Sequence, residues 1–128
     1  ISIKNCAFQA LSSLEGISLP PSLKEIGPQA FEGSSSLTHI SIPSSVFEID
    51  YSTFSECSSL KEIVIPSFVI RIRAKAFYHC TSLQKIFVPS SVISIEDSTF
   101  DGCSSITTVE LTSQLQELVI IHLEIARC

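Results

Sequence analysis

The segment FSECSSLKEIVIP, residues 54–66, contains the pattern that decides the fold. Ile63 and Ile65 are separated by one residue, and successive side chains of a β-strand point to opposite faces. We therefore expect a short strand that turns these two isoleucines inward and leaves Glu62 outward. Pro66 has no backbone N–H for a ladder, so the strand should end before it.

The same pattern returns every 23 residues along the chain. Its phenylalanines are Phe8, Phe31, Phe54, Phe77 and Phe100. Further rows of leucine, isoleucine, valine and proline keep the same step without an insertion. A period in the 20s that contains L-x-x-I-x-I is typical of leucine-rich repeats, in which each unit forms one turn of a solenoid. One turn cannot bury its apolar face alone, whereas stacked turns share a continuous core.

The repeat predicts a right-handed leucine-rich repeat solenoid of about five turns over residues 1–118. We expect one short strand per turn in a parallel β-sheet on the concave face, and irregular strands on the convex face. Val69 and Ile72 should point inward from the convex side, and a short helical or 3₁₀ turn should begin at Ala76. Ser45 and Ser91 follow the strand and should satisfy backbone groups of the turn.

Residues 119–128 break the period, and two interpretations of this tail remain open. It forms either an edge strand or a short helix, in both cases as a cap on the same domain. An end of a solenoid needs a polar cap for solubility, and this tail is not polar. The tail therefore either covers the open end or pairs with a second copy as a homodimer.

Composition excludes several classes of function. The chain has 128 residues, 45% hydrophobic and 16% charged, with a formal net charge of −5. No apolar run approaches the ~18 residues of a transmembrane helix. The eight lysines and arginines are scattered, which argues against binding nucleic acid. The absence of methionine and the first residue, Ile1, indicate a fragment or a processed form.

Five cysteines, an odd number, exclude a fully paired disulfide framework within one chain. Cys57, Cys80 and Cys103 form one row of the repeat, and we expect them to be buried as small hydrophobic residues. A disulfide or a metal site within the row is the alternative. Cys6 and Cys128 lie outside the row and are expected to be accessible thiols, Cys128 being a candidate for linkage between chains.

His79 precedes Cys80, a pairing that occurs both in metal sites and beside activated thiols. The repeat places Cys80 in the core row, whereas the row of His79 has no common chemistry and should face solvent. The histidines show no H-x-x-x-H spacing, and neither a G-x-S-x-G elbow nor a phosphate-binding glycine cluster occurs. We therefore expect no enzyme, no metal site and no cofactor.

Three motifs resemble one subclass of leucine-rich repeat, the BspA-like or Treponema pallidum type. They are I-P-S-S-V at 42–46 and its counterpart at 88–92, the A-F pair at 30–31 and 76–77, and F-x-x-C-x-S-L at 54–60. The chain departs from the pattern with Leu11 and Ser34 at the cysteine position, Phe68 in place of serine, and Thr112 in place of proline.

The resemblance covers residues 3 to about 118 and implies a surface-exposed or secreted adhesin that binds host proteins or cells. Members of this family are associated with mucosal bacteria and parasitic protists. An intracellular, cytoplasmic scaffold or regulatory protein built from the same repeat is the alternative. Free thiols and the absence of a glycosylation acceptor suit that alternative equally well.

The outward positions of the predicted strands vary in chemistry while the core rows do not, which favours a protein-binding surface. Phe87 beside Val64 should form an exposed apolar spot with a charged rim, as in interaction hot spots. The candidate binding residues are His39, Lys61, Glu62, Val64, Gln84, Lys85 and Phe87. The alternative is a solvated face with one stray aromatic side chain. Phe47 and Ile70, adjacent on the convex side, are a weaker second candidate or simply pack against each other.

Overall fold

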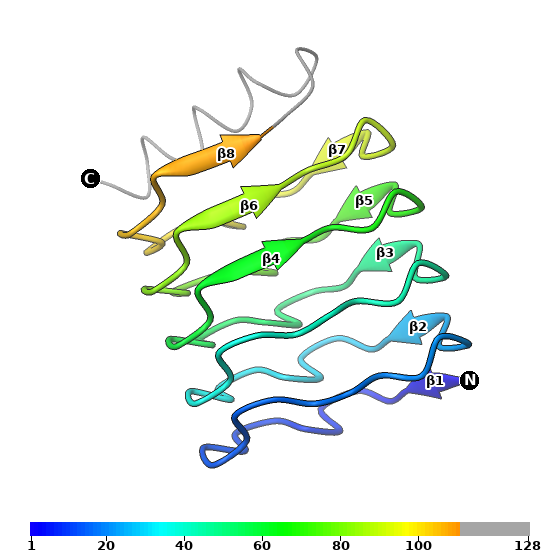
Figure 1. The fold of residues 1–128 in the computed structure, drawn as a ribbon, viewed down its shortest axis with the longest axis horizontal. Coiled ribbons are helices and arrows are strands. Elements are labelled where there is room, and N and C mark those ends of the chain that lie inside the picture. Colours follow the sequence, from blue (N-terminus) through cyan, green and yellow to red (C-terminus); the bar gives the residue numbers. More distant parts are fainter. Residues whose placement is uncertain (111–128) are drawn as a thin grey trace.

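The computed structural model describes residues 1–110, which form the stacked turns of a parallel β-solenoid (Figure 1). The first strands in the chain are β1 (Ser2–Ile3), β2 (Glu25–Ile26), β3 (Glu48–Ile49) and β4 (Glu62–Val64). They are followed by β5 (Arg71–Ile72), β6 (Lys85–Phe87), β7 (Ser94–Ile95) and β8 (Thr108–Glu110). The described residues contain no helix.

The strands form two faces around one core. We call β4, β6 and β8 the front sheet, and β3, β5 and β7 the back sheet; the pair β1–β2 is a third, separate sheet. All pairs are parallel, and each residue pairs with the residue 23 positions later, as Glu62 does with Lys85 and Ile63 with Ile86. The register therefore equals the sequence repeat, and each side chain stacks on members of its own row.

The first two turns differ from the expectation of one front strand per turn. Only one backbone bond joins each of them to the next turn on this side: Thr38 N to Glu15 O at 3.1 Å, and Lys61 N to Thr38 O at 3.4 Å. A ladder needs successive bonds, so the described residues form front strands on the last three turns only.

The core follows the predicted alternation. Ile63 and Ile65 point inward from the front sheet, and Val69 and Ile72 point inward from the back, all four at most 3% exposed. The phenylalanine row forms a ladder of nearly parallel rings with centroids 5.2 to 6.0 Å apart. Phe8 is half-buried, whereas the later four rings are fully buried.

The predicted helical or 3₁₀ turn at Ala76–Phe77 is wrong: residues 74–79 form hydrogen-bonded turns instead. Every second N–H there donates a hydrogen bond to the next turn: Ala76 N bonds to Arg73 O within the same repeat, whereas Phe77 N bonds to Thr99 O of the next one. Lys75 and His79 have positive φ angles of 58° and 54°. A helix requires consecutive intrahelical bonds and negative φ, so this alternation prevents one.

The cysteine row is buried, as predicted, and also makes a hydrogen bond that sequence reasoning missed. The thiols of Cys57, Cys80 and Cys103 donate to the backbone oxygens of Phe31, Phe54 and Phe77 at 3.2, 3.1 and 3.1 Å. Ser34 occupies the same row and its hydroxyl donates to Phe8 O at 2.8 Å. The row therefore selects a small donor, which explains why serine replaces cysteine there.

The predicted role of the serine row is also confirmed. Ser45 Oγ donates to Leu23 O at 2.5 Å, and Ser91 Oγ donates to Val69 O at 2.7 Å, in each case on the preceding turn. Phe68 holds the same position on the turn between them, where a phenyl ring can make no such bond.

Residues 111–128 lie outside the described part of the chain. The end of the solenoid near residue 118, the cap or edge strand at 119–128, the thiol of Cys128 and the homodimer through the C-terminal end therefore stay predictions.

Substitution of a ring in the middle of the phenylalanine ladder should cost more stability than substitution at its N-terminal end. Phe54 is fully buried between two stacked rings, whereas Phe8 is half-buried and stacks on one. We expect Phe54→Ala to lower the free energy of unfolding by about 3–5 kcal/mol, and Phe8→Ala to lower it by less. Urea denaturation followed by circular dichroism measures both values. Equal losses would show that burial within the stack does not determine the cost.

Alkaline pH should destabilise the fold through the cysteine row. Burial raises the pKa of Cys57 and Cys103 from 9.0 to about 12, and that of Cys80 well above its usual value. The folded pKa lies above the unfolded one, so this stability is fully present below pH 9 and is lost as pH rises toward 12. Each thiol contributes a slope of up to about 1.4 kcal/mol per pH unit.

The matched variant for this titration is Cys57→Ser, since Ser34 shows that a hydroxyl makes the same bond in this row. Urea denaturation at pH 8 to 11 should show a shallower loss of stability in the variant than in the wild type. Identical slopes in the two proteins would contradict a contribution from the buried thiol.

Candidate binding surface

The outward side chains of the front sheet bring the predicted binding residues onto one face. Val64 and Phe87 are neighbours in the register of β4 and β6, and Glu62 pairs with Lys85 in the same way. Val64 is 59% exposed, whereas Phe87 is only half-exposed. Phe87 lies on the central strand between Val64 and Glu110, so a neighbour on each side limits its exposure. Val64 therefore contributes more of the exposed apolar surface, and Phe87 less, than we expected from the sequence.

The remaining candidates line a shallow hollow beside this spot. Its volume is about 400 Å³, and its lining consists of Thr38, His39, Lys61, Glu62, Gln84 and Lys85. The hollow therefore gathers five of the seven predicted residues, while Val64 and Phe87 lie at its side. His39 Nδ1 lies 3.1 Å from Thr38 Oγ1, and its imidazole packs over Gly16 of the preceding turn. These two contacts fix the ring at the edge of the hollow.

The charges of the front sheet differ from those of the back sheet in how they are paired. Within residues 1–110 all three ion pairs lie on the back sheet. Lys61, Glu62 and Lys85 are exposed and form no ion pair there. A partner that contacts the front sheet can therefore pair with these charges without first breaking an ion pair within residues 1–110.

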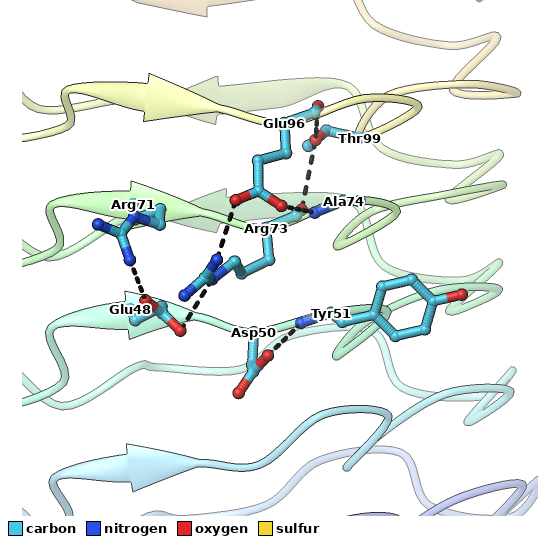
Figure 2. A network of polar contacts seen from close by, with 8 residues as sticks. All are labelled: Glu48, Asp50, Tyr51, Arg71, Arg73, Ala74, Glu96 and Thr99. Atoms are coloured by element: carbon cyan, nitrogen blue, oxygen red, sulfur yellow. Dashed lines mark hydrogen bonds and ion pairs between the residues drawn. The ribbon is translucent and has the colours of Figure 1, made fainter.

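A network of two arginines and two glutamates crosses the turns of the back sheet (Figure 2). Glu48 contacts Arg71 Nη1 at 3.4 Å and Arg73 Nε at 3.1 Å, and Arg73 Nη1 contacts Glu96 at 3.1 Å. Glu96 also accepts the backbone N–H of Ala74 at 3.1 Å. Sequence reasoning missed this network, although opposite charges 23 residues apart, as in Glu48 and Arg71, are the signal that indicates it.

Beside this network lies an exposed apolar surface, which we call the back ridge. It consists of Phe47, Phe68, Ile70 and Ile93, which are 47%, 66%, 41% and 72% exposed. Backbone bonds of 2.9 Å join Ile70 N to Phe47 O and Ile93 N to Ile70 O, so three of the four residues lie side by side on successive turns. The predicted pair of Phe47 and Ile70 is thus part of a larger surface.

His79 and Cys80 point in different directions, as predicted. Cys80 is fully buried, whereas His79 is exposed. The imidazole stacks on Tyr78 with a centroid distance of 4.1 Å and lies over Gly102 of the next turn, where a Cβ atom would clash with it. No group of three or more histidine, cysteine, aspartate or glutamate side chains in residues 1–110 is placed to hold a metal ion. In the same residues no helix is long and apolar enough to span a bilayer.

Comparison with known proteins identifies the repeat. The repeat family described as "BspA type leucine rich repeat region" matches residues 1–107, with six copies of the repeat. No curated protein matches the chain.

Three solved structures share the fold. A leucine-rich cell surface protein of Faecalibacterium prausnitzii aligns over 91% of this chain and 31% of its own, with 32% identity and a TM-score of 0.86. A leucine-rich repeat protein of Bacteroides ovatus aligns over 87% of this chain and 29% of its own, with 37% identity and a TM-score of 0.82. A leucine-rich repeat protein of T. pallidum aligns over 95% of this chain and 76% of its own, with 24% identity and a TM-score of 0.79.

The chain thus spans about a third of the length of the first two structures, and the third structure supports the fold alone. The six matched repeats, the register of 23 residues and the shared rows lead to the same conclusion. This chain belongs to the family of BspA-type leucine-rich repeat proteins.

Proposed function

We propose that this solenoid is a non-enzymatic protein-interaction module and that it binds its partner through the front sheet. The observation that carries the proposal is the contrast between rows. The inward rows repeat one kind of side chain, whereas the outward positions of β4 and β6 present Val64, Phe87 and exposed charges. An apolar centre with a charged rim is the usual composition of a protein-binding hot spot.

Membership of the family supports the first part of this proposal, namely that the chain is a protein-interaction module. Leucine-rich repeats are generally scaffolds without catalysis, and their extended surfaces bind other proteins. The F. prausnitzii relative is described as a cell surface protein. We therefore extend the proposal to a surface-exposed or secreted adhesin, of which this chain is the part that binds host proteins or cells.

An intracellular scaffold or regulator is the second candidate, and the described cysteines favour it. Cys6, Cys57, Cys80 and Cys103 are free thiols, and intracellular proteins keep cysteines reduced. Burial would protect three of the four in an oxidising compartment as well. The gene product separates the candidates, since a signal peptide or anchor supports the adhesin and an attached signalling domain supports the scaffold.

Charge reversal on the front sheet should weaken binding. The immobilised protein is used to capture proteins from host extracellular matrix and from cell lysate, and affinities for the captured proteins are measured by interferometry. Lys85→Glu should lower affinity because it reverses a charge at the rim, and Phe87→Ala because it truncates the apolar centre. We expect losses of about tenfold or more for each.

Lys75→Glu is the matched control, since Lys75 is exposed but lies on a turn of the solenoid rather than on the front sheet. It should keep the affinity of the wild type, and circular dichroism should show all variants folded. Unchanged binding of every captured protein by both front-sheet variants would exclude this face as the binding surface.

A further inference from the structure

We propose that the back ridge is a second docking surface, which takes an extended peptide segment of another protein that carries apolar side chains next to a carboxylate. This surface borders the back sheet, since Phe47, Ile70 and Ile93 directly precede β3, β5 and β7, and it does not depend on the function proposed above.

The solenoid itself does not require apolar side chains at the positions of the back ridge. Lys24 stands in the same row as Phe47, Ile70 and Ile93, and it is exposed while its backbone N–H still bonds to Ile1 O of the preceding turn at 3.1 Å. At 72% exposure, Ile93 leaves most of its side chain in contact with water. The fold therefore gains little from these side chains, and exposed apolar side chains on successive turns that the core does not need indicate a contact surface.

Phe68 strengthens this inference because it replaces a residue that stabilises the turn. Its counterparts Ser45 and Ser91 each donate a hydrogen bond to the preceding turn. Phe68 makes no such bond and leaves 66% of its surface exposed. Phe68 thus departs from the pattern of the repeat, because the turn lacks a hydrogen bond there and exposes an aromatic ring. Departures of this kind are expected at functional sites.

The ion-pair network beside the ridge determines which charge a partner should carry. Both of its carboxylates are engaged, since Glu48 contacts two arginines and Glu96 contacts Arg73 and the N–H of Ala74. Arg71 is bound only through Nη1, at 3.4 Å, and its side chain is 37% exposed. Its other guanidinium N–H groups make no hydrogen bond within residues 1–110. They are donors for an acceptor from outside, and a carboxylate matches their planar geometry.

The position of Ile70 next to Arg71 favours a partner in an extended conformation. Ile70 immediately precedes Arg71 and lies between Phe47 and Ile93 on the neighbouring turns. Alternate side chains of an extended peptide point to the same side. Apolar side chains at positions i and i+2 can therefore contact the ridge while an acidic side chain at i+4 reaches Arg71.

The test uses an array of ten-residue peptides with phenylalanine, isoleucine or leucine at i and i+2 and glutamate or aspartate at i+4, on a serine and glycine background. Each peptide has a counterpart with glutamine or asparagine in place of the acid. We expect the wild-type protein to bind a subset of the acidic peptides and to bind their neutral counterparts more weakly. Fluorescence anisotropy with labelled copies of that subset then gives the affinities.

The variants separate the two contributions. Phe68→Ser and Ile93→Ser should each weaken binding about tenfold or more, whereas Arg71→Gln should remove the preference for the acidic peptide over its neutral counterpart. Phe68→Ser introduces the residue that the repeat itself uses at this position, so it should keep the thermal transition of the wild type. Leu11→Ser and Lys75→Gln are matched controls away from the ridge and should bind like the wild type.

Three results would overturn the proposal. The first is that no acidic peptide binds better than a scrambled one. The second is that Phe68→Ser and Ile93→Ser bind like the wild type. The third is that light scattering shows a wild-type dimer that Phe68→Ser converts to a monomer, because the ridge would then be an interface between two copies. Lys85→Glu, which tests the front sheet, should leave peptide binding unchanged, so failure of one surface is distinguishable from failure of the other.

Discussion

The structure depends on the hydrogen bonds that run from the backbone of one turn to the backbone of the next. The phenylalanine row shows them most clearly: Phe31 N donates to Thr53 O at 3.0 Å, Phe54 N to Ala76 O at 2.9 Å and Phe77 N to Thr99 O at 3.1 Å. The alternate N–H groups close turns within their own repeat. This alternation fixes the offset between turns at one repeat. It thereby places every side chain on the equivalent side chain of the neighbouring turn, so the neighbours of a residue on the adjacent turns are members of its own row.

Because the rows are fixed in this way, each selects an interaction rather than a single amino acid. The thiols and the hydroxyl of Ser34 make the same bond to a phenylalanine carbonyl. Thr53 and Thr99 replace alanine without an unsatisfied group, since their hydroxyls donate to Asp50 O and Glu96 O, three residues earlier. Departures from a consensus therefore divide into those that keep the interaction and those, such as Phe68, that give it up.

The fold was predictable from the sequence because two independent periods agree. The step of 23 residues identifies the stacked turns, and the alternation around Ile63 and Ile65 assigns the inward side. The turn at Ala76–Phe77 was predicted wrongly because its geometry depends on positive φ at Lys75 and His79. Lysine carries no signal for that conformation, whereas the row of His79 does carry one that the prediction did not use, since Gly33 and Gly102 stand in it with φ angles of 73° and 77°.

The candidate site was predictable only in part. Outward positions follow from the alternation, so the residues of the front sheet were found. The half-burial of Phe87 depends on neighbours from two other turns, and the network of Glu48, Arg71 and Arg73 depends on which rotamers bridge adjacent turns. Such contacts between distant residues are fixed by packing, whereas the repeat alone determines only which residues are adjacent.

The two proposed binding surfaces of this solenoid differ in the kind of contact that each would make. The charges on the front sheet form no ion pairs within the described residues, so they attract a partner over a distance and should make association sensitive to salt. The carboxylates of the back-sheet network are already paired, so the proposed contact at the ridge combines apolar area with one charged contact at Arg71. Salt should therefore weaken the preference for an acidic partner and leave the apolar part of the contact largely unchanged. Both surfaces are available because the inter-turn hydrogen bonds and the buried rows hold the turns together without using the outward side chains. The outward residues of each face can thus vary separately. A substitution at an outward position of one face does not contact the core, so it should leave the other face unchanged.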